Sequence, residues 1–244
     1  MKVERFIFGP FQTNTYVVSD DRYILLVDPA CYTPYEQQQL YRYIENLSPF
    51  NFHLSILATH GHLDHLWGAA WACEKWNTPV LMHEADIPMA KAMQSQYDLF
   101  GIPAKAQPFP IEPINNDKLP MTNMSILSTP GHTPGSICLY FQKSPIPDHQ
   151  SPITNPQSPI TNPQSPLLFS GDTLFQMGYG RTDLPGGNFS QLIDSLDRLF
   201  ALPSDVQVFP GHGEHTTIAA EARWIVRERG MEEVNANRNI EGRS

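Results

Sequence analysis

The sequence has few cysteines, few basic residues and no long apolar run, and each scarcity excludes a class of protein. Its 244 residues include only Cys31, Cys73 and Cys138, so a disulfide framework is not expected and reduced thiols in a cytoplasmic protein are the simplest interpretation. Lys and Arg number 16 against 25 Asp and Glu, a net charge of −9 with His counted neutral, which argues against a broad nucleic-acid-binding surface. No apolar run approaches a membrane span, and the N-terminus lacks the apolar region and cleavage site of a signal peptide. We therefore expect no nucleic-acid or membrane partner.

What is present suits a soluble enzyme of one domain, which we place at 1–230. The hydrophobic fraction is 41%, enough to bury a substantial core. Residues 143–166 hold a Pro-rich insertion in which Ser151–Gln157 is repeated as Ser158–Gln164, and such dense prolines predict an inserted loop. Residues 231–244 are interpreted as a tail. Within it, 240–243 reads Ile-Glu-Gly-Arg, a protease site used in expression vectors, so this stretch is either a vector scar or native sequence.

Apolar patterning predicts alternating strands and helices. Strands are expected at 2–8, 14–19, 23–28, 53–58, 79–83, 123–128, 136–142, 167–170 and 206–209. Helices are expected at 34–47 with Thr33 as N-cap, at 66–76, within 84–100, at 189–200 and at 216–229, while 101–120 is expected to be a loop.

The most informative stretch is Thr59–His65, in which His60, His62, Asp64 and His65 lie within six positions. Imidazole and carboxylate groups are good ligands for zinc and similar divalent ions. The stretch falls between an expected strand and an expected helix, so we place it on a strand-to-helix turn at the rim of a cleft.

Three later motifs each add one ligand type after an expected strand. They are Thr129–Ser136 with His132, Phe169–Phe175 with Asp172, and Phe209–Gly213 with His212. Gly and Pro around these residues allow tight turns and close backbone approach. Five His and two Asp are enough for two metal ions that share one carboxylate. The isolated His83, His149 and His215 are not expected to bind metal.

In these motifs and their order the chain resembles the metallo-β-lactamase superfamily, and within it the glyoxalase II-like hydrolases. Asn14–Tyr16 and Val27–Pro29 fit the same pattern. Gly180–Gly187, which reads GRTDLPGG, resembles the short single-domain bacterial members. The resemblance implies an α/β fold, the αββα sandwich of two mixed β-sheets flanked by helices, with a metal site at one edge.

The resemblance also implies the ligand assignment. By position, His60, His62 and His132 match the ligands of the first ion, Asp64, His65 and His212 those of the second, and Asp172 the bridging carboxylate. The cofactors are then two divalent metal ions, zinc in the first place, with iron or manganese as alternatives. Asp28, at the end of an apolar strand, is expected to hydrogen-bond a ligand His rather than to bind metal.

A hydroxide shared by the two ions would attack an ester-like carbonyl, and Asp64 is the candidate catalytic residue for steering the proton. The resulting prediction is a metal-dependent hydrolase of thioesters such as hydroxyacylglutathione, with a small-molecule thioester as partner. A lactone or phosphoester hydrolase stays open. So does a persulfide dioxygenase, which shares the fold and uses one iron. A non-catalytic or nuclease-related member ranks last, and a class B β-lactamase is disfavoured because those enzymes usually carry Cys at the position of Asp172.

Substrate contacts are the weakest part of the pattern. In longer glyoxalase II enzymes a Lys, a Tyr and a C-terminal helical domain hold the glutathione carboxylates. Here Gly180–Asp183 reads Gly-Arg-Thr-Asp, and 31 residues follow Gly213, too few for that domain. Arg181 is the candidate substrate-binding residue, because a guanidinium binds carboxylates well.

Overall fold

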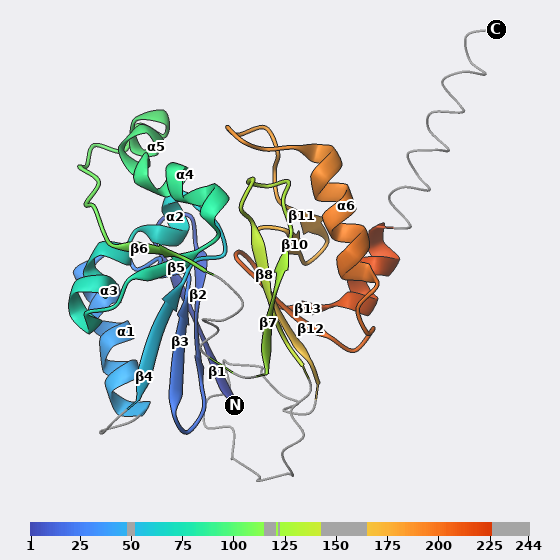
Figure 1. Cartoon of the computed structure of the whole chain (residues 1–244), viewed down its shortest axis with the longest axis horizontal. Coiled ribbons are helices and arrows are strands. Elements are labelled where there is room, and N and C mark those ends of the chain that lie inside the picture. Colours follow the sequence, from blue (N-terminus) through green and yellow to red (C-terminus); the bar gives the residue numbers. More distant parts are fainter. Residues whose placement is uncertain (48–51, 115–120, 122, 143–164, 226–244) are drawn as a thin grey trace, which may run out of the picture.

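The computed structural model describes residues 1–47, 52–114, 121, 123–142 and 165–225, which form two mixed β-sheets packed face to face (Figure 1). The first sheet has the strand order β1-β2-β3-β4-β5-β6. Its strands are β1 (Lys2–Phe8), β2 (Thr13–Ser19), β3 (Tyr23–Val27), β4 (His53–Leu57), β5 (Val80–Met82) and β6 (Ile111–Pro113). Strands β1 to β3 pair antiparallel and β3 to β6 pair parallel.

The second sheet has the order β13-β12-β9-β8-β7. Its strands are β7 (Met124–Ser128), β8 (Ile137–Phe141), β9 (Leu167–Gly171), β12 (Gln207–Pro210) and β13 (Thr216–Thr217). Strands β9 and β12 are parallel, and the other pairs are antiparallel. A separate hairpin joins β10 (Leu174–Phe175) to β11 (Gly178–Tyr179).

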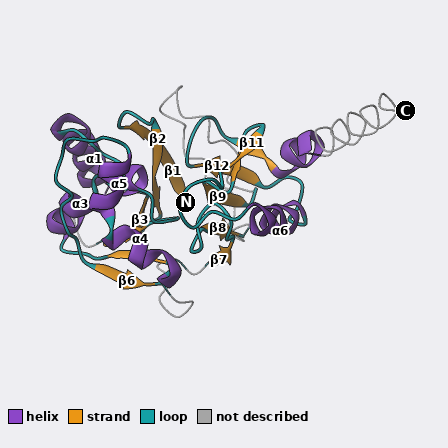
Figure 2. Cartoon of the chain, turned by 90° about the horizontal axis from the view of Figure 1, so that it is seen from above, coloured by secondary structure: helices purple, strands orange, loops and turns teal. Residues whose placement is uncertain are grey.

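Helices cover the outer faces of both sheets, as the view from above shows (Figure 2). The helices of the first half are α1 (Pro34–Leu47), α2 (Leu63–Leu66), α3 (Ala69–Trp76), the 3₁₀ turn η1 (Glu84–Asp86), α4 (Ile87–Lys91) and α5 (Met93–Leu99). Helix α6 (Phe189–Phe200) lies on the other side, and residues 218–225 are also helical. The order helix, sheet, sheet, helix confirms the expected αββα sandwich.

The first sheet contributes side chains to two hydrophobic clusters, one on each of its faces. In β3, Leu26 packs with Leu40 of α1 in the outer core, whereas its neighbour Leu25 points between the sheets toward the cluster that contains Phe169. Successive strand residues point to opposite faces, so a strand buried on both sides reads as a continuous apolar run. Each such Leu is fully buried and contributes about 1.5–3 kcal/mol.

Local signals in the sequence set several element boundaries. Helix α1 begins with a capping box, in which Thr33 Oγ1 accepts from Glu36 N at 3.3 Å and Glu36 Oε2 accepts from Thr33 N at 2.8 Å, so the N-cap prediction is confirmed. Helix α6 begins at Phe189 after Asn188, whose side chain accepts from Gln191 N. Its expected bounds of 189–200 are also confirmed.

Four expectations about elements are corrected. The helix expected at 66–76 is two helices divided at Gly68, where an added Cβ would lie 2.2 Å from Cys31 Sγ. Helix α2 begins at Leu63, so Asp64 and His65 lie on a helical turn and not on the preceding loop. The expected loop 101–120 contains β6, which pairs with β5. Residues 216 and 217, expected in a helix, pair with β12 as β13, and the β10–β11 hairpin was not predicted. These strands are two or three residues long, and long-range pairing rather than local pattern creates them.

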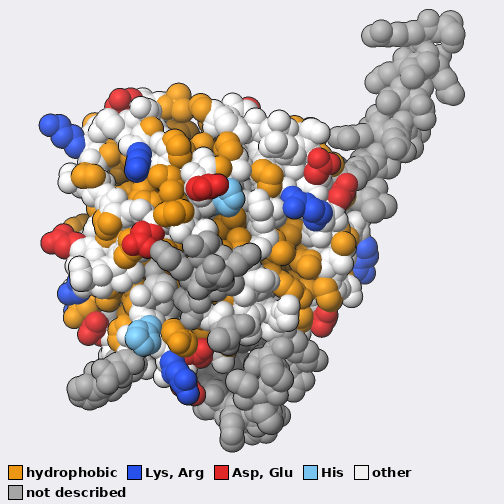
Figure 3. Space-filling model, in the orientation of Figure 1, with side chains coloured by type: hydrophobic (Ala, Val, Ile, Leu, Met, Phe, Trp, Pro, Cys, Tyr) orange, Lys and Arg blue, Asp and Glu red, His pale blue; other side chains and the backbone are white. Residues whose placement is uncertain are grey.

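Some predictions lie outside the described residues, namely the repeat at 143–164, the tail at 231–244 and the last residues of the helix expected at 216–229. Cys31, Cys73 and Cys138 are all free and buried, as expected for unpaired thiols. No helix among the described residues is both long and apolar enough to cross a membrane. On the face shown in Figure 3, acidic and basic side chains are interspersed, and the described residues form no continuous basic patch there.

Candidate metal centre

The ends of strands from both sheets bring the seven expected ligands to one place. His60 and His62 follow β4, Asp64 and His65 lie on α2, His132 lies between β7 and β8, Asp172 follows β9, and His212 follows β12. Their ligand atoms form three overlapping groups, each within 4.8 Å: His60, His62 and His132; His60, His65 and Asp172; and Asp64, His65 and His212. In the sequence these seven residues lie up to 152 positions apart, from His60 to His212, and the fold brings all of them together.

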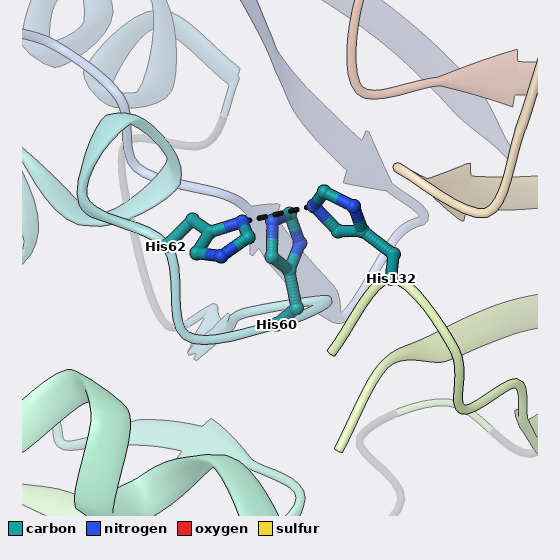
Figure 4. A group of neighbouring side chains, drawn as sticks. All are labelled: His60, His62 and His132. Carbon is teal, nitrogen blue, oxygen red and sulfur yellow. Dashed lines mark hydrogen bonds between the residues drawn. The ribbon is translucent and has the colours of Figure 1, made fainter. Parts of the chain in front are cut away.

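The first group consists of three buried imidazoles (Figure 4). His62 Nδ1 and His132 Nε2 lie 2.8 Å apart, and the ring of His60 is 4.8 Å from each of the other two. Burial and the neighbouring imidazoles lower the pKa of His60 well below its ordinary value, and the same causes lower the pKa of His62 to about 4. Neutral rings with free lone pairs are the form that binds a metal ion.

The second group places one carboxylate against two imidazoles. Asp64 Oδ2 lies 3.5 Å from His65 Nε2 and 3.2 Å from His212 Nε2, and it accepts a hydrogen bond from Thr13 Oγ1 at 2.9 Å. Burial alone would raise the pKa of Asp64, but His65 and His212 together outweigh it and hold the carboxyl ionised. Asp64 is thus arranged as an anionic ligand, and its proposed role in proton transfer stays a prediction.

Asp172 reaches both groups. Its Oδ1 lies 3.2 Å from His65 Nε2, and its Oδ2 lies 3.6 Å from His132 Nε2 and 3.5 Å from His212 Nε2. Each carboxylate oxygen therefore faces imidazoles, and the two oxygens together span the first and second groups. This is the placement that a shared carboxylate requires, although bridging itself stays a prediction.

Three buried polar atoms in the described part of the cluster have no hydrogen-bond partner: His60 Nε2, His65 Nε2 and Asp172 Oδ1. His65 Nε2 and Asp172 Oδ1 are close, yet their geometry is not that of a hydrogen bond. A buried polar atom left unpaired costs about 1–3 kcal/mol. Since all three atoms converge on one point, a metal ion there would satisfy them, and the imidazole and carboxylate donors fit zinc, iron or manganese.

The charge balance of the cluster also favours a cation. Burial alone would lower the pKa of His65, but Asp64, Asp172 and Asp28 raise it well above its ordinary value. The pKa of His212 is raised as well, since the carboxylates of Asp64 and Asp172 outweigh its burial. The carboxylates thus attract positive charge to the centre, and a divalent ion competes with these protons.

Polar groups behind the cluster orient the rings. Asp28 Oδ2 lies 2.9 Å from His65 Nδ1, and the same carboxylate accepts from Thr59 N at 2.7 Å and from Thr59 Oγ1 at 2.8 Å. Asp28 has φ 53°, a left-handed conformation that Asp and Asn adopt more readily than most residues. Asp28 therefore contacts His65, one of the expected ligands, and lies outside the three groups of ligand atoms, as the sequence led us to expect.

Backbone carbonyls hold two further rings. His132 Nδ1 lies 2.7 Å from Arg181 O, and His212 Nδ1 lies 3.1 Å from Phe11 O. Because a neutral imidazole carries one proton, donation from Nδ1 to a carbonyl leaves Nε2 as the free ligand atom. The sequence carried no signal for these two contacts, since a carbonyl is common to every residue.

Arg181 forms an exposed ion pair with Asp183. Its Nε and Nη2 donate to Asp183 Oδ1 and Oδ2, each at 2.6 Å, and both side chains are more than half exposed. The substrate contact expected of Arg181 stays a prediction, whereas its carbonyl has the ring-orienting contact that the sequence missed.

Two glycines are required by the crowding around Asp172. A Cβ at Gly211 would lie 2.2 Å from Asp172 Oδ1 and 2.7 Å from His65 Cε1. A Cβ at Gly180 would lie 1.9 Å from Asp172 O and 2.9 Å from His132 Nδ1. Backbone here approaches the ligands too closely for any side chain.

Two polar residues that support the ligand loops were not assigned a role from sequence. Asn14 Nδ2 donates to Pro210 O and Gly213 O, both at 2.9 Å, and so holds the loop that carries His212. Asp86 is fully buried and accepts from the two loops that carry the three-histidine group. Asn14 lies in the stretch Asn14–Tyr16, which fits the pattern of the metallo-β-lactamase superfamily, but no local pattern indicated Asp86.

The remaining histidines are not part of the cluster. His83 Nδ1 accepts from Ala85 N at 3.2 Å, and the ring of His215 stacks on Phe209. Neither occurs in the groups of ligand atoms found among the described residues, as expected. His149 lies outside the described residues.

Solvent reaches the cluster from the side of His212, whose side chain is 28% exposed, against 13% for Asp64 and 11% for Asp172. A hollow of about 190 Å³ adjoins this ring and is lined by Ile7, Phe11, Gln12, Asn14, Gly213 and Glu214. The cluster is therefore most open to solvent on this side.

Comparison with known proteins agrees with this geometry. The model of the metallo-β-lactamase superfamily matches residues 8–146 and 157–212. A relative from Bacillus subtilis, the probable metallo-hydrolase YqgX, is 33% identical over 91% of this chain and 94% of its own length. The hydroxyacylglutathione hydrolase GloC of Haemophilus influenzae is 32% identical over 91% of this chain and 96% of its own.

A solved structure, that of TTHA1623 in a di-iron-bound form, superposes with a TM-score of 0.71 at 30% identity and covers 90% of this chain and 97% of that one. The prediction of a metal-dependent hydrolase is confirmed at this coarse level, while the metal and the substrate are not determined by these likenesses. From its motifs, its αββα fold and the matched residues, the chain belongs to the metallo-β-lactamase superfamily.

Proposed function

We propose that this protein is a thioester hydrolase of the glyoxalase II type that uses two divalent metal ions, zinc in the first place. The observation that carries the proposal is the position of Asp172, whose two oxygens lie within 3.6 Å of His65, His132 and His212. One carboxylate between two ligand groups suits a pair of ions. A relative of similar length that is called a hydroxyacylglutathione hydrolase supports the substrate class.

When bound, the ions would supply Lewis acidity and lower the pKa of water, so that hydrolysis needs no Ser or Cys nucleophile. The contribution of the chain is to hold the donors in place. His60, His62 and His132 would hold one ion, and Asp64, His65 and His212 the other, with Asp172 between them. Asp64 lies beside His212, on the more exposed side of the cluster, where its carboxylate would direct the proton of the attacking water toward the departing thiolate.

Several contacts bear on which thioester is bound. The hollow beside His212 is lined by Ile7 and Phe11, and its acidic residue Glu214 is paired with Arg5 at 3.1 Å. Arg181 is occupied by Asp183. Among the described residues that line the hollow, no lysine or arginine is available for the two carboxylates of glutathione. We therefore expect slow turnover of S-lactoylglutathione, with a high KM.

The test is hydrolysis of S-lactoylglutathione by the zinc-loaded protein under anaerobic conditions, since a hydrolytic reaction needs neither oxygen nor a redox-active metal. His83→Ala serves as a matched control, because it removes an imidazole that lies outside the ligand groups. We expect activity in the wild type and the control, and none in His62→Ala. The proposal fails if zinc-loaded protein is inert toward thioesters while iron-loaded protein consumes oxygen with glutathione persulfide.

Lactones and phosphoesters serve as the comparison substrates in the same assay. A thiolate is a better leaving group than the alkoxide of a lactone. We therefore expect the same centre to hydrolyse thioesters faster than lactones. A phosphoester that is hydrolysed faster than every thioester would replace the proposed substrate class.

A further inference from the structure

Asp86 connects the two loops that carry the three-histidine group. It is the last residue of η1, it is fully buried, and its carboxylate accepts three hydrogen bonds. Oδ2 accepts from Gly61 N at 2.8 Å and from Thr133 Oγ1 at 2.6 Å, and Oδ1 accepts from Gly135 N at 2.6 Å. Gly61 stands between His60 and His62, and Thr133 follows His132. One side chain thereby connects a loop of the first sheet to a loop of the second.

The contacts of Asp86 are confined to one half of the metal centre. Its partners lie in the loops of His60, His62 and His132. The other buried carboxylate behind the cluster, Asp28, contacts His65 directly and reaches His60 only through Thr59, whose Oγ1 lies 3.1 Å from His60 Nδ1. His65 belongs to the second group. The direct partners of the two carboxylates therefore differ: Asp28 contacts the ring of His65, and Asp86 contacts the loops of the three-histidine group.

The loops around Asp86 are too tightly packed to move independently. A Cβ at Gly135 would lie 2.7 Å from Asp86 Cγ, and a Cβ at Gly61 would lie 3.0 Å from Asp86 O. Thr133 Oγ1 lies 2.7 Å from Ser136 Oγ, and Thr133 N donates to the same Ser136 oxygen at 3.1 Å. The hydrogen bonds of Asp86 thus help to set the distance between His132 and the other two rings, together with the bond from Ile137 N to Thr59 O at 2.9 Å.

We propose that Asp86 is a positioning residue that sets the affinity of the three-histidine site for its metal ion and leaves the site of Asp64, His65 and His212 largely unaffected. The inference rests on the proposed metal site, but it does not depend on the substrate. Asp86 contacts the loops and no ligand atom. A change at Asp86 should therefore alter the affinity for the metal ion, and turnover should change only as a consequence.

Asp86→Asn is the sharpest perturbation because it keeps the size of the side chain. A carboxylate offers acceptors only, whereas an amide replaces one oxygen with a donor. In either orientation the new NH₂ faces Gly61 N or Gly135 N, and at least one buried backbone N–H loses its acceptor. Changes of residues that orient ligands typically weaken metal binding about 10- to 100-fold, and we expect a loss in that range at the three-histidine site alone.

Two control changes separate positioning from general damage. Asp20→Asn alters an exposed carboxylate that likewise accepts two backbone N–H groups, those of Arg22 and Tyr23, both at 2.8 Å, and it should change neither site. Asp28→Asn should weaken the site of His65 more than the three-histidine site, because Asp28 contacts His65 directly and His60 only through Thr59. Thr133→Val removes one hydrogen bond to Asp86 and should weaken the three-histidine site less than Asp86→Asn, whereas Thr133→Ser keeps the hydroxyl and should restore wild-type affinity.

The experiment titrates the full-length, chelator-stripped protein with cobalt(II) and follows the visible absorption of the bound ion, with circular dichroism as the check of folding. The binding phases are assigned with His62→Ala and His212→Ala. We expect Asp86→Asn to weaken only the phase that is lost in His62→Ala. Equal weakening of both phases, or affinities that match those of Asp20→Asn, would overturn the inference.

The titration also separates this inference from the proposed function. If the wild type binds only one cobalt ion per chain, the two-ion site fails, and the role of Asp86 is then decided by whether Asp86→Asn weakens that ion more than Asp28→Asn does. If selective weakening is found in a protein that is inert toward thioesters, the proposed substrate fails and the role of Asp86 stands.

Discussion

Replacement of Asp172 by alanine tests the shared carboxylate directly. Each proposed ion has three ligands of its own and shares Asp172 as the fourth, so Asp172→Ala removes one ligand in four from both. Its oxygens face His65 at 3.2 Å, His212 at 3.5 Å and His132 at 3.6 Å. Loss of a residue that only orients a ligand costs about 10- to 100-fold in affinity, equivalent to about 1.4–2.7 kcal/mol. Loss of a direct ligand should exceed this at both ions.

The fold itself should persist in this variant. Asp172 lies on the loop after β9, outside the three apolar clusters that make up the core of the described residues. Elemental analysis after gel filtration should find close to two ions per wild-type chain and well under one in Asp172→Ala, with thioester turnover abolished and the circular dichroism spectrum unchanged. His62→Ala is the contrasting variant, because it should release one ion and retain the other. Unchanged metal content in Asp172→Ala would refute the shared carboxylate.

The structure leads to four further predictions. Zinc binding to the metal-free protein at pH 7 should release protons, because the pKa of His65 is raised well above its ordinary value, the pKa of His212 is raised as well, and a ligand imidazole must be neutral. Calorimetry in buffers of different ionisation enthalpy measures this release, and its absence would contradict the assignment. By the same shift, His65 stabilises the metal-free protein below about pH 6.5, and that stability should be lost as the pH rises through its folded pKa, which melting temperatures across pH can follow. Gly211→Ala should weaken both ions, since its Cβ would lie 2.2 Å from Asp172 Oδ1, whereas Gly101→Ala, at a position where nothing lies within 4 Å of the new Cβ, should leave the metal content unchanged. Deletion of Ser151–Gln164 should hardly alter the melting temperature, because β8 and β9 pair directly with each other; a large drop would show that the repeat packs on the body.

The features that could be predicted from the sequence are those that depend on residues close together in the chain. Four ligands fall within six positions at Thr59–His65, and the other three are each flanked by Gly or Pro, so their patterns are visible without any knowledge of distant contacts. The bounds of helix α6 could be predicted because its apolar stripe at helical spacing lies within the segment and its N-cap, Asn188, directly precedes it. The capping box at Thr33 and Glu36 has the same local character.

Features that depend on residues far apart in the chain were decided only by the tertiary structure. Asp86 has partners 25, 47 and 49 positions away, and Asp64 accepts from Thr13 across 51 positions, so neither contact leaves a local pattern. Strands β6, β10, β11 and β13 are two or three residues long, and pairing rather than propensity creates them. The sequence by itself determined which side chains can bind metal, because that depends on residue type and local spacing. Their distances, ring orientations and supporting carboxylates depend on the packing of two sheets, and only the folded structure supplies these.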